Sequence, residues 1–328
     1  MELKPMKLRI LAPLLAIAMA TGSARAQAKY LPESNNAALR YWVAIEEMRD
    51  NPLTEEATHN MLLAVMKGET AWSEEKMGPV LDVYADSIQT MQRGTKLPDC
   101  NWGLDYQLGN LNINNLLMRS RGLEQLNTVQ GVRQLAKGDS KAAVETWRAG
   151  IRFSQDLGRS GPVINALVAS AILMDELNAV ANYAGPGKLS EAGREELYAA
   201  VKAMPEDGFD WGVSWGVETA IGEEWFRKLR SSDDPGAYYK RLGMPVPKGV
   251  PPSQQDVEKY REFMLAAQAA LREPPEKAKP LLEDWESRTH KLSQVLQLQV
   301  GGLGPMSNKA REKVAETREH LLQALSAK

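Results

Sequence analysis

The chain has 328 residues, of which 43% are hydrophobic, 25% charged and 6% aromatic, and its formal net charge is −2. These values are typical of a globular protein that is long enough to bury a large core. Because the chain is nearly neutral, it has no basic field that could hold a polyanion, and we expect no nucleic-acid partner.

The N-terminal segment has the pattern of an export signal. Three basic residues precede or begin an 11-residue apolar stretch at residues 10–20. Ala24-Arg25-Ala26 then offers a small-x-small cleavage site, and a second such site follows two residues later. We therefore expect residues 1–26 to be a signal peptide.

The alternative for this segment is a membrane anchor. Its apolar stretch is much shorter than the ~20 residues that a spanning helix needs. The longest later apolar run, Ala166 to Met174, ends at an Asp-Glu pair. We expect an exported protein, periplasmic or extracellular, that is soluble and has no membrane span once the signal is removed.

The residues that usually carry metal or covalent chemistry are scarce. Cys100 is the only cysteine, so no intramolecular disulfide is possible, and we expect it to be buried as a small apolar residue. His59, His290 and His320 fall in different predicted helices and have no ligand spacing. The HExxH, P-loop, dinucleotide GxGxxG and GxSxG motifs are absent. The sequence thus predicts no metal and no cofactor, and an enzyme is the less favoured class.

The residue pattern is helical almost throughout, so the predicted fold class is all-α. Alternating strand runs and Asn-Gly hairpin signals are absent, and helix-favouring residues dominate. We expect helices at about residues 36–49, 54–67, 73–93, 111–137, 162–183, 190–204, 209–230, 253–272, 275–300 and 307–327.

Details of three of these helices can be predicted. In the first, the spacing places Leu39, Trp42, Val43 and Glu46 on one face. The third contains Pro79, which is a candidate break. The last, at about 307–327, is rich in charge, and we expect it to cap the stack toward solvent.

Residues 131–150 carry the clearest signal of a supersecondary motif. Gly131, Ala143 and Gly150 are small where two antiparallel helices must approach, and Trp147 is large enough to fill the remaining gap. Gly138-Asp139 supplies the turn and the cap of the next helix. This spacing resembles one tetratricopeptide repeat.

The repeat does not propagate cleanly, because one period later the small position falls at Asn165. We expect stacked antiparallel helical hairpins, as either a tetratricopeptide-like α-solenoid or an irregular helical bundle. Residues 231–252 are polar and rich in Pro and Gly. They predict a loop or linker between a domain at 27–230 and C-terminal helices at 253–328 that pack on the same domain.

A wider resemblance adds to this picture. After the export signal, the chain has an opening helix with Asn36-Ala37-Ala38-Leu39-Arg40-Tyr41-Trp42, a Cys100-Asn101-Trp102-Gly103 loop, and the hairpin just described. In this it resembles a group of uncharacterised secreted helical-repeat proteins of environmental bacteria. The resemblance covers roughly residues 35–225, implies an all-helical fold and brings no activity with it.

The stretch 208–226 is the first candidate site. Numbered as a helix, Trp211, Trp215, Glu218 and Trp225 lie on one stripe. The stripe fits a groove in which indoles stack on sugar rings and Glu218 acts as an acid, with a second carboxylate nearby. It also fits a core stripe whose glutamate bonds an arginine, an indole N–H or a helix terminus. We favour the core, because buried polar groups are commonly paired structurally.

Two further candidate regions come from the N-terminal half. The loop at 94–110 places Trp102 beside Asp105, and it is either a binding loop or a segment packed over the helices. Asn115 and Arg119 start a helix that could line a concave binding face.

Taken together, these patterns predict an exported interaction or scaffold protein of the bacterial envelope that binds a peptide or protein partner. The alternative is a carbohydrate-binding or carbohydrate-active envelope protein centred on Glu218, and a third reading is an envelope component without a small ligand.

Overall fold

The computed structural model describes residues 34–48, 55–104, 113–159, 161–185, 187–241 and 245–327, without the side chains of 113–115 and 241. Within these ranges the chain is helical and forms no strand, and one isolated backbone bridge joins Asn36 to Asp99. The expected all-α fold is confirmed. The segment expected to be a signal peptide lies outside the described residues.

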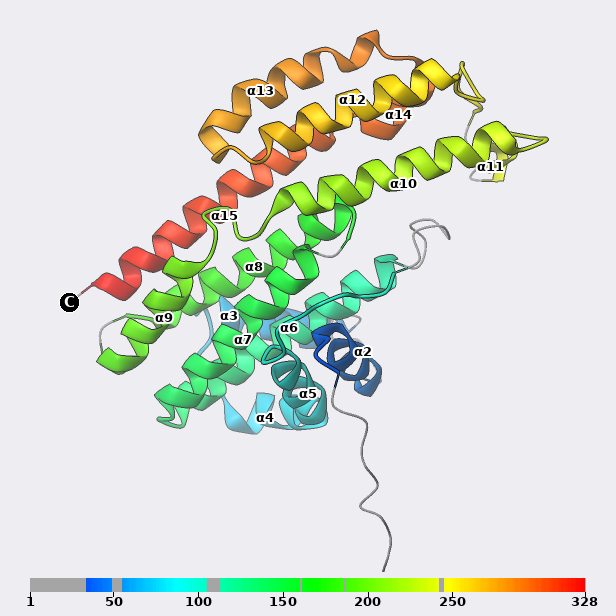
Figure 1. Cartoon of the computed structure of the whole chain (residues 1–328). Helices are drawn as coiled ribbons and strands as arrows, with labels where there is room; N and C mark the ends of the chain where they lie inside the picture. Colours follow the sequence, from blue (N-terminus) through cyan, green and yellow to red (C-terminus); the bar gives the residue numbers. More distant parts are fainter. Residues whose placement is uncertain are drawn as a thin grey trace, which may run out of the picture. The chain divides into compact units, whose positions relative to one another are not determined.

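Residues Asn36–Lys328 form one compact unit (Figure 1). The helices in chain order are α2 (Ala37–Glu47), α3 (Glu56–Met66), α4 (Glu74–Val83), α5 (Ala85–Gly94), α6 (Ile113–Ala136), α7 (Ser140–Gly158), α8 (Val163–Tyr183), α9 (Glu191–Ala203), α10 (Trp211–Ser231), α11 (Ala237–Arg241), α12 (Gln254–Ala270), α13 (Pro275–Ser287), α14 (Gln294–Val300) and α15 (Leu303–Ser326). A short 3₁₀ turn at Thr289–Lys291 lies between α13 and α14.

The helix ends follow local capping chemistry. Asp139 accepts a hydrogen bond from the Ala142 N–H at the start of α7, and Ser253 forms a capping box with Asp256 at the start of α12. Gly68, with φ of +69°, follows the last turn of α3, where a left-handed residue ends many helices.

α8 lies at the centre of the unit. It packs against α6, α7, α10 and α15, with α3 also in contact (Figure 1). Among the described residues it is the one helix whose length and composition would suit a membrane span. Most of it is buried by the surrounding helices, which is the setting of a core helix in a bundle.

Neighbouring helices form antiparallel hairpins, but the contacts do not stay between neighbours in the chain. α6 packs against α7, and α7 packs against α8. α15, however, returns from the end of the chain to pack along α8 and α9, and α2 packs against α5. A solenoid has contacts only between adjacent repeats, so this arrangement is an irregular helical bundle.

The α6–α7 hairpin is built as the sequence predicts. A Cβ atom on Gly131 would lie 2.3 Å from Trp147 Nε1, so only glycine permits this crossing. The Trp147 indole donates to the Thr128 carbonyl at 3.1 Å. The two helices have 24 and 19 residues, so this hairpin is already longer than the about 34 residues of a tetratricopeptide repeat.

The face of α2 that contains Leu39 and Val43 is not its buried face. Leu39 and Val43 are 51% and 44% exposed. The helix instead buries the face that contains Ala38, Tyr41 and Ala44. Small residues let α2 approach α5 closely, and a Cβ on Gly94 would lie 2.7 Å from the Tyr41 ring.

Two predicted helices are divided. The helix expected at 73–93 breaks at Tyr84 and not at Pro79, because α4 packs against α6 whereas α5 turns to pack against α2. The helix expected at 275–300 becomes α13, the 3₁₀ turn and α14.

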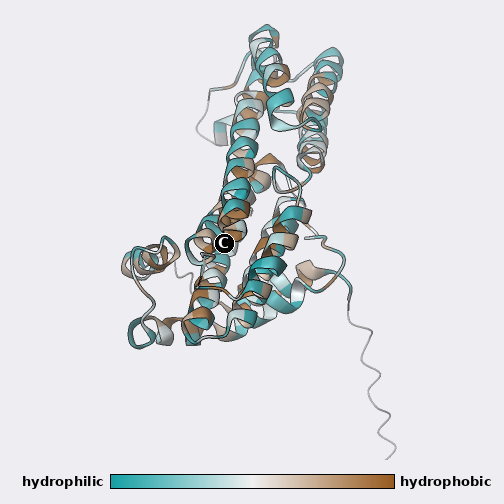
Figure 2. Ribbon diagram, turned by 90° about the vertical axis from the view of Figure 1, so that its left-hand side faces the viewer, coloured by the Kyte–Doolittle hydropathy of each residue, from teal (hydrophilic) through white to brown (hydrophobic). Residues whose placement is uncertain are grey.

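The last helix is not an outer cap. α15 begins at Leu303 and packs between α8, α9 and α13. Arg311 is only 2% exposed; its Nε donates to Asp207 Oδ2 at 2.6 Å, and its Nη2 donates to the Glu273 carbonyl. Most other charged residues of α15 are exposed, but Arg318 donates to the Val201 and Lys202 carbonyls in the last turn of α9. The helices in general have hydrophilic and hydrophobic faces (Figure 2).

The 231–252 segment contains α11. Tyr239 of this helix is buried and packs against Trp225 of α10, with ring centroids 5.8 Å apart. The described part of the segment thus belongs to the same compact unit as the helices on either side.

Candidate functional site

The tryptophan stripe of α10 lies in the core. Trp211 and Trp215 are 1% and 0% exposed. The Trp211 indole donates to the Asp207 carbonyl at 3.1 Å, and the Trp215 indole donates to Ser307 Oγ at 3.3 Å. Neither ring has a free face on which a sugar could stack.

Glu218 holds the start of α8. Its Oε2 accepts a hydrogen bond from the Val163 N–H at 3.1 Å, and Val163 is the first residue of that helix. Burial raises the pKa of this carboxyl above its ordinary value, and the Val163 hydrogen bond opposes the shift. One structural role expected for Glu218 was a hydrogen bond to a helix terminus. The contact with the Val163 N–H is such a bond.

The other carboxylates of α10 are also committed to structure. Asp210 caps the helix by accepting from the Gly212 N–H. Glu223 pairs with Arg261, and Glu224 pairs with Arg227. The glycines of α10 make room for α12, since a Cβ on Gly222 would lie 2.1 Å from the Tyr260 hydroxyl.

Trp225 is the least buried indole of the stripe. It is half-buried and packs edge-on against Tyr238 and Tyr239 of α11 at 5.8 Å. Its Nε1 is buried and has no hydrogen-bond partner in the part of the chain that the structure describes. Through this aromatic cluster α11 packs against α10.

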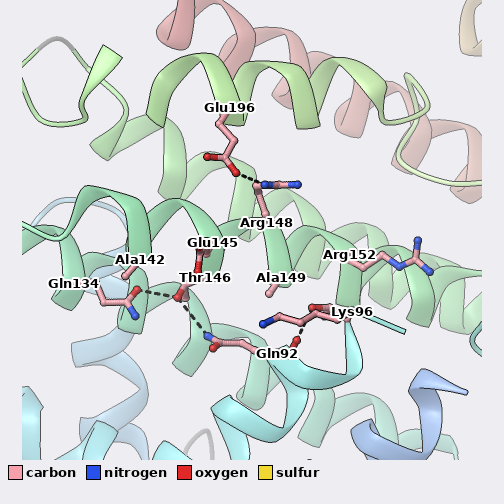
Figure 3. Close-up of a pocket in the computed structure, with 11 residues that line it drawn as sticks. Gln92, Lys96, Gln134, Ala142, Glu145, Thr146, Arg148, Ala149, Arg152 and Glu196 are labelled. Atoms are coloured by element: carbon pink, nitrogen blue, oxygen red, sulfur yellow. Dashed lines mark hydrogen bonds and ion pairs between the residues drawn. The ribbon is translucent and has the colours of Figure 1, made fainter. Parts of the chain in front are cut away.

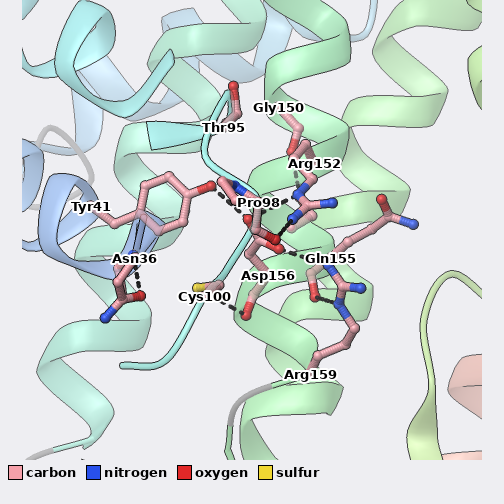
Figure 4. Close-up of polar contacts among 12 residues, drawn as sticks. Asn36, Tyr41, Thr95, Pro98, Cys100, Gly150, Arg152, Gln155, Asp156 and Arg159 are labelled. Atoms are coloured by element: carbon pink, nitrogen blue, oxygen red, sulfur yellow. Dashed lines mark hydrogen bonds and ion pairs between the residues drawn. The ribbon is translucent and has the colours of Figure 1, made fainter. Parts of the chain in front are cut away.

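The loop that contains Trp102 is packed against α7. The Trp102 indole is buried and donates to the Asp156 carbonyl at 3.1 Å. The Asp156 carboxylate accepts from the Tyr41 hydroxyl at 2.7 Å, from Arg152 at 3.0 Å and from Arg159 at 2.7 Å (Figure 4). These contacts join α2, the loop and α7 in one polar cluster.

Cys100 lies at the edge of this cluster. Burial and the nearby Asp156 raise the pKa of its thiol to about 12. A nucleophilic cysteine needs the opposite shift. Asp105, which was predicted beside Trp102, lies outside the described residues.

Arg119 was expected to line an open binding face. In the structure it instead contacts the C-terminal end of α2. Its Nη2 donates to the carbonyls of Ile45 and Met48, which lie in the last turn of α2 and at its C-cap. Those carbonyls have no acceptor role inside the helix, so Arg119 satisfies them. Asn115 is in α6, but its side chain is outside the described residues.

A polar groove lies between α5, α6, α7 and α9. One part has a volume of about 590 Å³ and a second part about 340 Å³, and Gln92 and Gln134 line both. Sequence reasoning did not predict it. We call these two parts, which share Gln92 and Gln134, the amide groove, and Figure 3 shows the larger part.

A relay of hydrogen bonds fixes the floor of the amide groove. Asn127 Nδ2 donates to the Thr146 carbonyl at 2.9 Å. A carbonyl can only accept, so the other end of this amide, Asn127 Oδ1, must be an acceptor. Gln92 Nε2 donates to that oxygen at 2.9 Å and to Thr146 Oγ1 at 3.3 Å. The Thr146 hydroxyl in turn donates to Gln134 Oε1 at 2.8 Å.

The relay leaves two groups without partners among the described residues. Because Gln92 uses its nitrogen, its Oε1 is an available acceptor. Because Gln134 uses its oxygen, its Nε2 is an available donor. Asn127 and Thr146 are buried beneath them. The floor thus presents one acceptor and one donor in fixed orientation, which is the complement of a peptide group.

The rim of the amide groove carries both signs of charge. Arg148 pairs with Glu196 across the gap between α7 and α9 (Figure 3). Lys96 and Glu145 are exposed and form no side-chain hydrogen bond or ion pair with another described residue. Described residues do not bring three or more metal-ligating side chains together here or elsewhere.

Some signal for the groove was present in the sequence. Gln89 and Gln92 are three residues apart, and Gln130 and Gln134 are four apart, so each pair shares a helix face. The sequence does not indicate that the face with Gln92 and the face with Gln134 meet, because the two faces belong to different hairpins.

The chain matches no protein-family model, no curated protein and no solved structure. The geometry of the groove is therefore the basis on which a function is proposed.

Proposed function

We propose that this chain is an exported helical interaction protein of the bacterial envelope that binds an extended peptide segment in the amide groove. The observation that carries the proposal is the relay through Asn127 and Thr146, which fixes a free acceptor on Gln92 and a free donor on Gln134.

A glutamine side chain offers the same groups as a peptide bond. An extended segment with a free N–H and a free C=O could pair with both glutamines without any requirement on its side chains. The volume of about 590 Å³ lies within the range of ligand pockets and suits a few residues of a longer segment. Lys96 and Glu145 would then select among side chains at the rim.

The envelope location rests on the pattern of residues 1–26, a basic start, a short apolar stretch and a small-x-small site. The Gly131–Trp147 crossing resembles that of a tetratricopeptide repeat, although the hairpin is longer and the bundle is not a solenoid. The carbohydrate alternative draws no support from α10, since Trp211 and Trp215 have no exposed face.

The test is a selection of random displayed peptides on the chain without residues 1–26. Amide hydrogen exchange is then compared with and without a selected peptide. We expect slower exchange in α5 and in the α6–α7 hairpin. A protein that selects no peptide, or one whose protection lies along α10 and α12 at the groove that includes Glu223 and Gln254, contradicts the proposal.

A further inference from the structure

Two glutamates face each other inside the bundle, next to the amide groove. Glu124 on α6 and Glu176 on α8 both have 0% exposure. The Thr128 hydroxyl lies between them, 2.5 Å from Glu124 Oε1 and in hydrogen-bond contact with Glu176 Oε2. Among the described residues, no cation forms an ion pair with either carboxyl.

The contacts of Thr128 require a proton on one of the carboxyls. A threonine hydroxyl has one proton, so it can donate to only one of two carboxylates. The other carboxyl contacts the same oxygen and must itself donate. Burial, together with the adjacent Glu176, raises the pKa of Glu124 well above its ordinary range, and burial raises the pKa of Glu176 to about 7.

Other charged groups around the pair are already engaged or face elsewhere. Asp175, next to Glu176, pairs with Arg121 at 3.1 Å. On α3, which packs against both helices, His59 is the one ionisable residue that is not exposed. On α7, Arg148 and Arg152 line the amide groove on the other side of the helix.

Glu176 and Asn127, which belongs to the hydrogen-bond relay of the amide groove, both lie close to Gly150. A Cβ on Gly150 would lie 2.8 Å from Glu176 Oε1 and 2.9 Å from Asn127 Nδ2. Both atoms therefore occupy the space that a side chain on α7 would fill. Glu176 Oε1 is buried and has no hydrogen-bond partner among the described residues, whereas Asn127 Nδ2 donates to the Thr146 carbonyl.

We infer that Glu124, Thr128 and Glu176 form a proton switch for the amide groove. While both carboxyls are protonated, Asn127 stays on the Thr146 carbonyl and the relay is ordered. When Glu176 loses its proton and Glu124 keeps its own, the ionised Glu176 draws the Asn127 amide to its Oε1. The hydrogen bond from Asn127 to the Thr146 carbonyl is then lost. As a result, Gln92 and Gln134 lose their fixed orientation, and the affinity for the peptide falls.

The peptide part of this inference rests on the proposed function, but the switch itself can be tested without a peptide. The readout is the side-chain amide NMR signal of Asn127, assigned by its loss in Asn127→Ala and followed from acid to alkaline pH. We expect it to shift with a midpoint near pH 7. Glu176→Gln should abolish the shift. Glu124→Gln should not move the midpoint to lower pH, because Glu124 is still protonated when Glu176 ionises and its hydrogen bond favours the ionised form of Glu176.

Glu316→Gln on the exposed face of α15 is the control and should leave the midpoint unchanged. An Asn127 signal that does not titrate, or one that still titrates in Glu176→Gln, overturns the switch.

The second readout is the affinity of a peptide selected on the chain at mildly acidic pH. We expect about a tenfold loss per pH unit above the midpoint in the wild type, and no such loss in Glu176→Gln. Affinity that is independent of pH while Asn127 titrates overturns the coupling to the groove. If Asn127 titrates but no peptide binds at any pH, the switch is supported and the proposed function is contradicted.

Discussion

At the scale of single residues, the buried polar groups of this protein mostly join segments that are distant in sequence. Asp156 joins α2 and the loop before α6 to α7, and Glu218 of α10 holds the start of α8. A raised pKa in such groups follows from burial and does not by itself indicate catalysis.

Glu218→Ala should lower the free energy of unfolding by about 1–3 kcal/mol, because it leaves the buried Val163 N–H without an acceptor. Glu218→Gln keeps an acceptor oxygen and should cost less than about 1 kcal/mol. Urea unfolding followed by tryptophan fluorescence measures both. Equal effects of the two substitutions would show that the hydrogen bond to α8 does not stabilise the fold.

Cys100 should be an unreactive thiol in the folded protein. Its pKa of about 12 leaves very little thiolate at mildly alkaline pH. We expect alkylation by iodoacetamide to be at least about 100-fold slower in the folded chain than in urea. Similar rates in the two conditions would mean that the loop around Cys100 opens freely.

At the scale of helices, close crossings depend on glycine. Gly131 admits Trp147 between α6 and α7, and Gly150 admits Glu176 and Asn127 between α7, α8 and α6. In α2, too, the buried face contains the small residues Ala38 and Ala44, whereas Leu39 and Val43 are exposed.

Gly131→Ala should destabilise the protein by about 1–3 kcal/mol, because the new methyl group would overlap the Trp147 ring. The gain in helix propensity, about 1 kcal/mol, is too small to offset this. Gly185→Ala is the matched control. No atom lies within 4 Å of the Cβ it would add, and its effect should stay within about 0.5 kcal/mol. A neutral Gly131→Ala in thermal or urea unfolding would refute the close crossing.

At the scale of the whole molecule, the buried glutamates make stability depend on pH. The pKa values of Glu124 and Glu176 are raised in the folded state, so the folded chain binds more protons than the unfolded chain above about pH 4.5. Their favourable contribution is complete below that pH and is lost as the pH rises through their folded pKa values.

The free energy of unfolding should therefore fall as the pH rises from about 4.5 toward and beyond 7, by up to about 1.4 kcal/mol per pH unit for each proton involved. The double variant Glu124→Gln/Glu176→Gln, which stays neutral, should show a much flatter profile. Denaturant unfolding at a series of pH values measures this. A wild-type stability that rises over this range would contradict the assignment.

Much of the fold could be predicted from the sequence, because it is set by local signals. Gly138, Asp139 and Ser253 mark helix ends through turn and capping chemistry that needs no tertiary contact. The course of α15 could not be predicted, since its packing along α8 and its Arg311–Asp207 ion pair join segments that are far apart in the sequence.

Most of the candidate site could not be predicted from the sequence. The α10 stripe was visible in the spacing of Trp211 and Trp215, but the spacing could not distinguish core from cleft. The amide groove depends on Gln92, Asn127 and Thr146 meeting from three helices. The Asn127–Thr146 and Thr146–Gln134 contacts lie within the predicted hairpin, whereas the contacts of Gln92 do not.

The most direct test of the central claim is the affinity of a selected peptide for Gln134→Glu compared with the wild type. Glutamate keeps the oxygen that accepts from Thr146, but it replaces the free donor by a second acceptor. Gln254→Glu, in the groove between α10 and α12, is the matched control.

We predict that Gln134→Glu weakens binding by at least about tenfold while Gln254→Glu leaves it unchanged, with both variants folded by circular dichroism. Equal affinities for the wild type and Gln134→Glu would contradict a peptide site that uses this donor.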